Sequence, residues 1–247
     1  KSEIMPRLFP SPEPEVEQGR HRRRKGGYDA MANLRSWTPK TRLGRMVRNG
    51  EITTFEQAMN SRLPIREVEI VDALLPGLED EVINVNMIQR MTDSGRRVRF
   101  NVLCVVGNSD GYVGLAICKG KEVASTIRKA IDKAKLNLIP VMRGNGSWES
   151  GGGPGTSVPL KVTGRSGSTR VTLMPAPAGK GLVIGDYGRR VLLLAGVSDV
   201  WSRSAGQTRT TINYAQATFN ALVELNKTRI SEGDRNRLNI TSGRGEQ

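Results

Sequence analysis

The chain has 247 residues and a formal net charge of +14 at pH 7, because Lys and Arg number 38 against 24 Asp and Glu. This excess of positive charge is far from the usual balance of a metabolic enzyme and predicts a polyanionic partner, either nucleic acid or an anionic membrane surface. The membrane alternative is weak, because no stretch approaches the roughly 20 apolar residues of a spanning helix and no signal peptide opens the chain. We therefore expect a cytoplasmic protein.

The scarce residue types exclude several kinds of site. Aromatic residues make up only 4% of the chain, which favours recognition of an RNA backbone and its shape over base readout. The two cysteines, Cys104 and Cys118, cannot supply a disulfide framework or a four-ligand zinc site. The single histidine, His21, stands in a polycationic run, where an imidazole is a poor general base. We expect no catalytic residue, no metal and no cofactor.

Residues 1–50 are predicted to form a basic N-terminal arm and extension. The first thirty residues lack helical and strand periodicity, and residues 40–48 contain no compensating acid. Such a run is often only a solvated tail, and the alternative is an arm that threads between RNA helices. The cations that we predict to bind RNA in this region are Arg20, Arg22, Arg23, Arg24, Lys25, Arg42, Arg45 and Arg48.

Residues 51–81 reverse the sign of the charge, with eight acidic side chains against two arginines. An apolar stripe after Glu51 predicts a short helix that begins near Thr53 or Thr54, and residues 68–74 are a second candidate helix. An acidic patch on a basic chain is poorly placed for nucleic acid. We interpret this segment as a docking surface for a basic protein neighbour.

Residues 82–143 change to a β pattern that is followed by a helix. Alternation of apolar and polar residues predicts a strand up to a turn at 92–95, and then a strand over 98–106 with one apolar face. A hairpin turn at 108–111 leads into a returning strand. The helical period over 121–138 leaves a basic polar face, which suits a polyanionic partner.

Two glycine loops could be taken for phosphate cradles. A nucleotide-binding loop runs from a strand directly into a helix, whereas Gly107, Gly111 and Gly114 belong to a turn and its two strands. The second loop, residues 179–185, has no Ser or Thr after its lysine and no glycine five residues before it, so it departs from the phosphate-binding pattern at two positions. Neither loop predicts a nucleotide site.

The hairpin turn also predicts where the cysteines lie. With Ser109 and Asp110 as a two-residue loop, Cys104 would face Leu115 across the two strands, and Cys118 would fall on the other face of the sheet. We therefore expect no disulfide between them.

Residues 144–157 are rich in Gly and Ser and are predicted to link the first domain to a second one, residues 158–230. The tail, residues 231–247, is polar and predicted to be frayed. The elements predicted for the second domain are a hairpin around 164–167, a helix capped by Asp186 and ended by Gly196, a short strand near 199–201 and a last helix over 211–226.

Several short runs, in matching order over about residues 80–226, resemble the small-subunit ribosomal protein S-five family. In the first half these runs are 95–100 (GRRVRF), 105–108 (VVGN), 111–114 (GYVG), 120–123 (GKEV) and 127–130 (IRKA). In the second half they are 175–177 (PAP), 179–181 (GKG), 194–197 (LAGV), 199–200 (DV) and 217–219 (ATF). The runs 37–44 (WTPKTRLG) and 207–211 (QTRTT) are similar to the archaeal branch of the family.

The resemblance implies an α+β protein with an N-terminal domain like double-stranded-RNA-binding folds, a C-terminal two-layer α/β domain with a left-handed crossover, and a basic N-terminal extension. It also implies a place in the small ribosomal subunit beside ribosomal protein S-four, with ribosomal protein S-eight against the C-terminal domain. That neighbourhood bears on decoding accuracy and on the messenger RNA entry path.

Two departures from the family pattern affect these expectations. Double-stranded-RNA-binding folds begin with a helix, whereas the pattern here predicts strands directly after Glu81, so the acidic helices over 52–74 are interpreted as an archaeal extension instead. Some archaeal relatives carry cysteines in the linker where this chain has Asn145, Ser150 and Gly152. We therefore expect no metal site in the linker.

The main hypothesis is thus an RNA-binding structural protein of the ribosome, with small-subunit rRNA as its partner. The alternative is a phosphotransferase-like enzyme that binds a nucleotide in the 179–185 loop, since fold does not fix function. Beyond the arm, the predicted RNA-binding residues are Arg96, Arg97, Arg99, Lys119, Lys121, Arg128, Arg165 and Arg170. The predicted protein-interface residues are Lys180, Gly181, Arg189 and Arg190.

Overall fold

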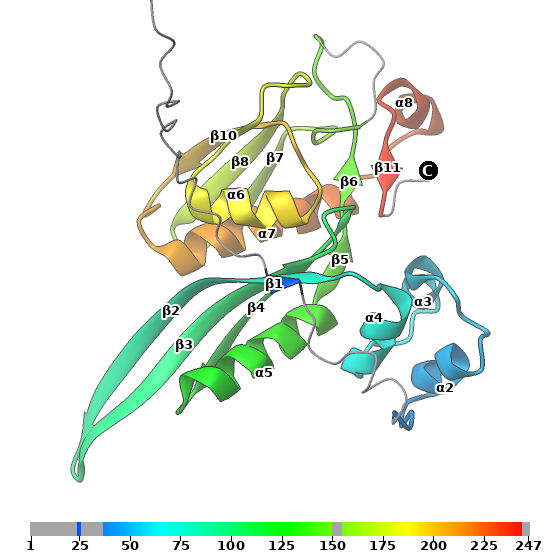
Figure 1. Cartoon of the computed structure of the whole chain (residues 1–247). Helices are drawn as coiled ribbons and strands as arrows, with labels where there is room; N and C mark the ends of the chain where they lie inside the picture. The colour runs from blue at the N-terminus through cyan, green and yellow to red at the C-terminus, as the bar shows by residue number, and fades with distance from the viewer. Residues whose placement is uncertain (1–23, 26–36, 150–154, 244–247) are drawn as a thin grey trace, which may run out of the picture.

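The computed structural model describes residues 24–25, 37–149 and 155–243. Its helices and sheets are stacked in four layers (Figure 1). The C-terminal sheet is outermost, and helices α6 (Asp186–Leu194) and α7 (Thr211–Lys227) lie beneath it. The N-terminal sheet follows, and helix α5 (Val123–Leu136) covers its far face.

Three short helices precede the N-terminal sheet: α2 (Arg42–Arg48), α3 (Phe55–Asn60) and α4 (Val68–Leu74). The two helices predicted in the acidic segment are confirmed. Thr54 begins α3 through a capping box, in which its hydroxyl accepts from Gln57 N and the Gln57 side chain accepts in return. This arrangement satisfies two backbone donors that a helix start leaves open.

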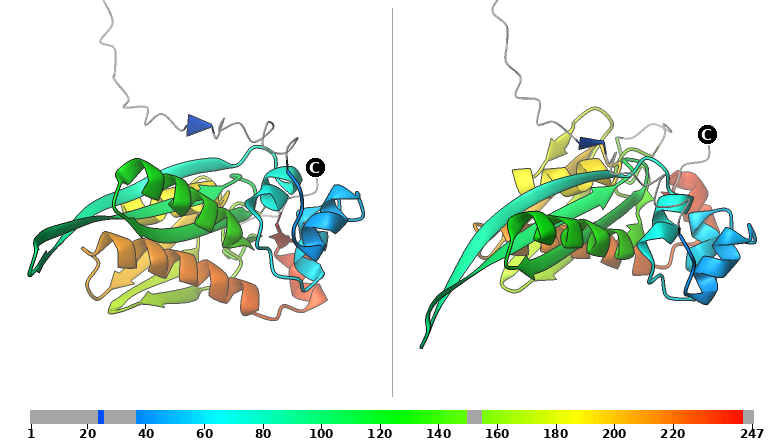
Figure 2. Two further views of the ribbon diagram at one scale, coloured as in Figure 1. Left: turned by 90° about the horizontal axis from the view of Figure 1, so that it is seen from below. Right: turned by 60° about the horizontal axis from the view of Figure 1, so that its bottom comes forward.

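The N-terminal sheet has the strand order β1-β2-β3-β4-β5. Its long hairpin of β2 and β3 projects well beyond the rest of the molecule (Figures 1 and 2). The strands are β1 (Arg24–Lys25), β2 (Glu79–Thr92), β3 (Gly95–Gly107), β4 (Tyr112–Gly120) and β5 (Leu138–Pro140).

Helix α4 packs in the same core as α5. Val71 and Leu75 belong to one buried cluster with Val102 of β3 and Ala130 of α5. The order α4-β2-β3-β4-α5 is therefore the helix, three strands and helix of a double-stranded-RNA-binding fold. The interpretation of this acidic helix as an extension, instead of the first helix of that fold, is wrong.

Residues 101–107 of strand β3 are buried on both faces, not on one as the alternation predicted, whereas residues 95–99 are exposed. Val102 and Cys104 face the α5 side, whereas Leu103 and Val105 belong to the core formed with the C-terminal domain. The prediction failed because a sheet covered on both sides needs apolar residues at every position.

The hairpin between β3 and β4 has a different register from the one predicted. Asn108 N donates to Tyr112 O, so the turn holds one residue more than expected, and Cys104 lies opposite Ala116. Cys118 lies opposite Val102 and thus on the same face as Cys104. The prediction of opposite faces was wrong, and both thiols are free.

The C-terminal sheet has the strand order β7-β8-β10-β9. Its strands are β7 (Val162–Ser166), β8 (Thr169–Pro175), β9 (Leu182–Val183) and β10 (Val200–Ala205). Strands β9 and β10 are parallel and α6 connects them, which is the crossover that the resemblance implied. The predicted hairpin, helices and strand are all present. The cap of α6 is Gly185, however, so the cap predicted at Asp186 is wrong by one position.

The tail is ordered as far as residue 243, where fraying was predicted. Helix α8 (Glu232–Arg237) is followed by β11 (Thr241–Ser242), which pairs with β6 (Met142–Arg143). Ile240 between them is buried. The two ends of the predicted linker also pair with each other, through Gly144 and Ser157. Apolar residues that look isolated in a polar tail are buried here by a distant segment of the chain.

Candidate nucleic-acid interface

One face of the projecting hairpin is basic. In the β2–β3 register Arg90 lies opposite Arg97 and Ile88 opposite Arg99, while the β3–β4 register places Lys119 opposite Asn101. These pairs share one face of the sheet, where Arg90, Arg97, Arg99 and Lys119 line a common groove with Ile88 and Thr92. No residue that lines this groove in the described part of the chain is acidic. Four uncompensated cations in one groove suit a polyanion.

A second groove continues this surface to the start of α5. Its lining shares Arg99 and Lys119 with the first groove and adds Lys121, Ser125 and Lys129. Glu122, the N-cap residue of α5, is the single acid among the lining residues that the structure describes. The two grooves thus form a cationic strip that runs from the hairpin to the helix. Arg and Lys side chains in such a strip can donate to phosphates, which a duplex exposes, whereas most of its base edges are out of their reach.

The opposite face of the hairpin has a different character. Arg96, predicted to belong with Arg97 and Arg99, lies on this side, opposite Met91. The same face carries the exposed side chains of Met87 and Met91, which are 58% and 75% accessible. Arg128 lies on α5 and is absent from the lining of both grooves.

Two residues of the strip were missed by the sequence analysis, Arg90 and Lys129. Arg90 could have been found by counting back from the predicted turn at 92–95, because that turn places it opposite Arg97. Lys129 lies eight residues after Lys121, which is two steps of four in the helical period predicted over 121–138.

The basic helix α2 is held in place by one carboxylate. Glu67 Oε1 accepts from Lys40 N at 2.9 Å and from Thr41 N at 2.6 Å, and its Oε2 accepts from Trp37 Nε1 at 2.8 Å. Partial burial acts to raise the pKa of Glu67, but the hydrogen bonds from Thr41, Trp37 and Lys40 together hold it below its ordinary value of 4.5. The cations predicted to bind RNA from α2, all exposed, are Arg42, Arg45 and Arg48.

Other acids of the 51–81 segment also bind within the chain. Asp72 forms an ion pair with Lys135 of α5 at 2.7 Å, and Glu81 forms one with Arg190 of α6 at 3.4 Å. The segment was predicted to dock a basic neighbour. Within the chain, its carboxylates at Glu67, Asp72 and Glu81 hold parts of this protein together.

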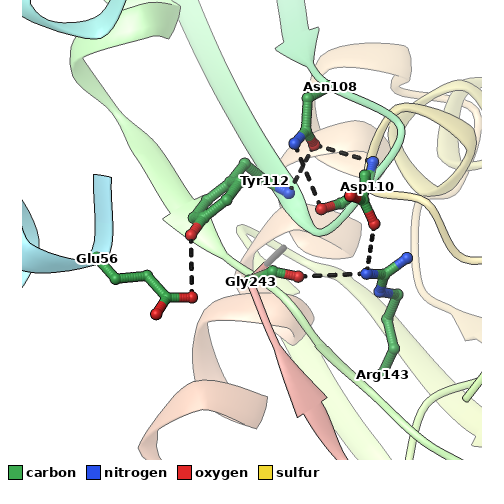
Figure 3. Close-up of polar contacts among 6 residues, drawn as sticks. All are labelled: Glu56, Asn108, Asp110, Tyr112, Arg143 and Gly243. Atoms are coloured by element: carbon green, nitrogen blue, oxygen red, sulfur yellow. Dashed lines mark hydrogen bonds and ion pairs between the residues drawn. The ribbon is translucent and has the colours of Figure 1, made fainter. Parts of the chain in front are cut away.

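The glycine turn at 108–111 is anchored by a polar cluster that joins distant segments (Figure 3). Asn108 Oδ1 accepts from the backbone N–H groups of Asp110 and Tyr112. Arg143 donates to Asp110 Oδ1 at 2.7 Å and to Gly243 O at 3.2 Å. The turn therefore binds β6 and the C-terminal segment. Its amides and carboxylate are occupied by the protein itself, as expected for a structural turn and not for a nucleotide cradle.

Comparison with known proteins decides the family. Residues 78–142 match the family model described as "Ribosomal protein S5, N-terminal domain", and residues 164–237 match "Ribosomal protein S5, C-terminal domain". The chain is 53% identical over 210 residues to "Small ribosomal subunit protein uS5" of Methanothermobacter thermautotrophicus, which covers 85% of this chain and 97% of that protein. It is 58% identical over 194 residues to the protein of the same name from Methanospirillum hungatei. That alignment covers 78% of this chain and 95% of the relative. The chain belongs to the ribosomal protein S5 family.

The two S5 domains correspond to the two sheets of the fold. The first match begins at Leu78, just before β2, and ends in β6. The second begins within β7 and ends at the last residue of α8. Relatives of the archaeal type, including the "Small ribosomal subunit protein uS5" of Thermoplasma acidophilum at 54% identity over 80% of this chain, also confirm the archaeal resemblance.

S5 proteins are ribosomal proteins and not enzymes, which removes the phosphotransferase alternative. The geometry of the 179–185 loop agrees. Its glycine and lysine residues, 179–181, end the connection from β8 to β9, and the amide of Gly181 donates to the buried carboxylate of Asp199 at 2.7 Å. A phosphate bound there would have to displace that carboxylate from the amide, and the two negative charges would then repel each other.

The remaining predicted residues lie on separate surfaces. Arg165 and Arg170 face each other on β7 and β8, and both are exposed. Lys180 and Arg189 are exposed near the start of α6, whereas Arg190 is half-buried in its ion pair with Glu81. The backbone of Arg24 and Lys25 forms β1, which pairs with β2 at Asp80 and Glu79. Arg20, Arg22 and Arg23 lie outside the described residues.

The described residues contain no helix long and apolar enough to span a bilayer. Within the same ranges, no group of three or more His, Cys, Asp or Glu residues is arranged to hold a metal ion.

Proposed function

We propose that this protein is a structural constituent of the small ribosomal subunit, in the cytoplasm, where it binds the small-subunit rRNA. Membership of the S5 family supports the ribosomal role. The observation that carries the RNA-binding part is the cationic strip, in which Arg90, Arg97, Arg99 and Lys119 share one groove without an acid among its described lining residues. Phosphates of an RNA duplex are the polyanion that such a strip fits.

The strip binds by position and charge. Each phosphate contact releases about one counterion, so affinity falls steeply with salt and hardly depends on sequence. Helix α2 adds Arg42, Arg45 and Arg48, held toward RNA by the Glu67 carboxylate, and the basic run from Arg20 to Lys25 adds contacts between RNA helices. The same proposal covers Arg96, Lys121, Arg128, Arg165 and Arg170.

A salt titration of rRNA binding tests the proposal. We expect Arg97→Gln and Lys119→Gln each to reduce the slope of log K against log salt by about one unit, with equal effects on different duplex sequences. Lys227→Gln is the matched control, because this exposed lysine of α7 already pairs with Glu224 at 2.7 Å. Unchanged slopes for both groove variants, together with lowered melting temperatures, would show that these cations only brace the fold.

A second part of the proposal concerns protein neighbours. We propose that Lys180, Gly181 and Arg189, next to the start of α6, contact ribosomal protein S-four. Ribosomal protein S-eight contacts the C-terminal domain in this proposal. The site then affects decoding accuracy near the messenger RNA entry path. Lys180 and Arg189 are exposed and lie on adjoining elements, which supports a shared surface.

Reconstitution of the small subunit tests the protein contacts. We expect Arg189→Glu to reduce retention of S-four, whereas Arg229→Glu, at an exposed arginine after α7, should leave it unchanged. Equal retention with both variants would remove Arg189 from the interface.

A further inference from the structure

The outer face of the C-terminal sheet is uncovered in the described part of the chain. Helices α6 and α7 both pack on the inner face, where Val171, Leu173 and Val200 are buried (Figures 1 and 2). Over residues 169–174 of β8 and 200–203 of β10 more buried and more exposed residues alternate, and in both strands every second side chain points outward.

The strand register arranges the outward side chains in three rows. The first row joins Arg165, Arg170 and Ala205, and the second joins Thr163, Thr172 and Arg203. The third row joins Met174, Trp201 and Val183. Successive rows are two residues apart along the strands, which is about 7 Å.

Charge and polarity change in order along this face. Three arginines occupy the first two rows, and none of the side chains in the three rows is acidic. The hydroxyls of Thr163 and Thr172 lie 3.0 Å apart between the arginines. The third row is apolar, with Trp201 37% and Val183 55% accessible. The indole of Trp201 is thus accessible from the open side of the sheet.

We infer that this face binds an unpaired RNA strand, with a base stacked on Trp201 and the adjoining phosphates held by Arg203, Arg170 and Arg165. The inference rests on the proposed function and adds a second, chemically different RNA site to the cationic strip. Three guanidiniums on rows that carry no acidic side chain fit a polyanion better than they fit a protein surface. An indole on an open sheet stacks with the face of a base, and a base exposes that face only outside a duplex.

The two RNA sites therefore make opposite demands on the ligand. The hairpin groove has cations and no aromatic lining residue among those described, so it accepts duplex RNA through its phosphates. The C-terminal sheet face presents an aromatic ring beside arginines, the combination that single-stranded binders use. The low aromatic content of the whole chain argued against base stacking in general. Stacking of one base needs only one aromatic ring, however, and the fold places Trp201 on the open sheet face beside the arginines.

Binding to two RNA probes tests the inference: a single-stranded RNA oligonucleotide and a fully paired RNA duplex. We expect Trp201→Ala to weaken binding of the single strand by about tenfold at an unchanged salt slope, and to leave duplex binding as it was. Trp201→Phe should restore most of the affinity, because phenylalanine still stacks. Arg203→Gln should reduce the single-strand salt slope by about 0.7.

The controls separate this inference from the proposed function. Trp148→Ala changes the other strongly exposed tryptophan, which is 90% accessible and lies in the loop after β6, and should have no effect. If Trp201→Ala and Arg203→Gln both leave single-strand binding unchanged while Arg97→Gln still lowers the duplex slope, the inference is overturned and the proposed function stands. If the wild type binds neither probe, the proposed function fails as well. If the Trp201 variant instead loses a protein neighbour from reconstituted subunits with RNA binding intact, the face is a protein interface.

Discussion

The indole Nε1 of Trp37 donates a 2.8 Å hydrogen bond to the carboxylate of Glu67, thirty residues further along the chain. The other oxygen of that carboxylate accepts from Lys40 N and Thr41 N, where α2 begins. An acid predicted to recruit a basic neighbour thus fixes the protein's own basic helix against the acidic segment. The contact makes the position of α2 depend on one ionised group.

Glu67→Gln is expected to destabilise the protein by about 1–3 kcal/mol at neutral pH, because a charged acceptor of three N–H groups is replaced by an amide that has one acceptor oxygen. Urea unfolding measures the change. Glu51→Gln, at an exposed acid of the same segment, is the control and should have little effect.

The loss should depend on pH in a defined direction. Because the folded-state pKa of Glu67 lies below its ordinary value of 4.5, its contribution to stability is present above that value and disappears as the pH falls through the lowered folded-state pKa. The difference between wild type and Glu67→Gln should therefore shrink in acid. A difference that is constant from neutral pH to about pH 3 would assign the effect to packing and not to the charge.

The two thiols should differ in reactivity. Burial raises the pKa of Cys104 to about 12, with further contributions from Asp80 and Cys118, so almost none of this thiol is ionised at pH 8. Cys118 is only half-buried. A thiol-specific reagent at pH 8 should modify Cys118 in the native protein and Cys104 only after unfolding, and Cys118→Ser should abolish the native reaction. Equal native rates at both positions would contradict the burial of Cys104.

Alanine substitutions at two glycines with positive φ should distinguish the cost of backbone strain from the cost of a steric clash. Gly95 (φ +108°) has open space around it, so Gly95→Ala should destabilise the protein by only about 1–2 kcal/mol. At Gly111 (φ +91°) an added Cβ would lie 2.0 Å from Gly243 O, so Gly111→Ala should cause a larger loss and release the C-terminal segment. Thermal unfolding and limited proteolysis after α8 measure both effects. Equal losses would mean that the tail does not pack on the turn.

Arg90→Gln tests the register of the projecting hairpin. Arg90 lies opposite Arg97 and lines the same groove, so its neutralisation should lower the salt slope of duplex RNA binding by about one unit, as Arg97→Gln does. Arg66→Gln, at an exposed arginine between α3 and α4, serves as the control. A normal slope for Arg90→Gln beside a reduced slope for Arg97→Gln would show that the two side chains do not share a ligand.

The sequence by itself determined the family and those elements that local signals specify. The helices over 55–60, 68–74 and 211–227 and the hairpins at 92–95, 108–111 and 164–167 follow from local periodicity, capping residues and turn glycines, all of which act within a few residues. The short runs from GRRVRF at 95–100 onward were sufficient for the family resemblance. The net charge of +14 was sufficient to predict a polyanionic partner.

Only the tertiary structure decided which faces are buried and which cations share a groove. Residues 101–107 of β3 are buried on both sides because α6 covers the face that alternation left for solvent, and the polar tail is ordered because Ile240 and β11 pack on β6. One additional residue in the 108–111 turn moved Cys118 to the face of Cys104. The pairing of β2, β3 and β4 likewise brought Arg90, Arg97, Arg99 and Lys119 to one groove. These outcomes depend on contacts between segments far apart in the chain, and a local pattern carries no information about what will cover it.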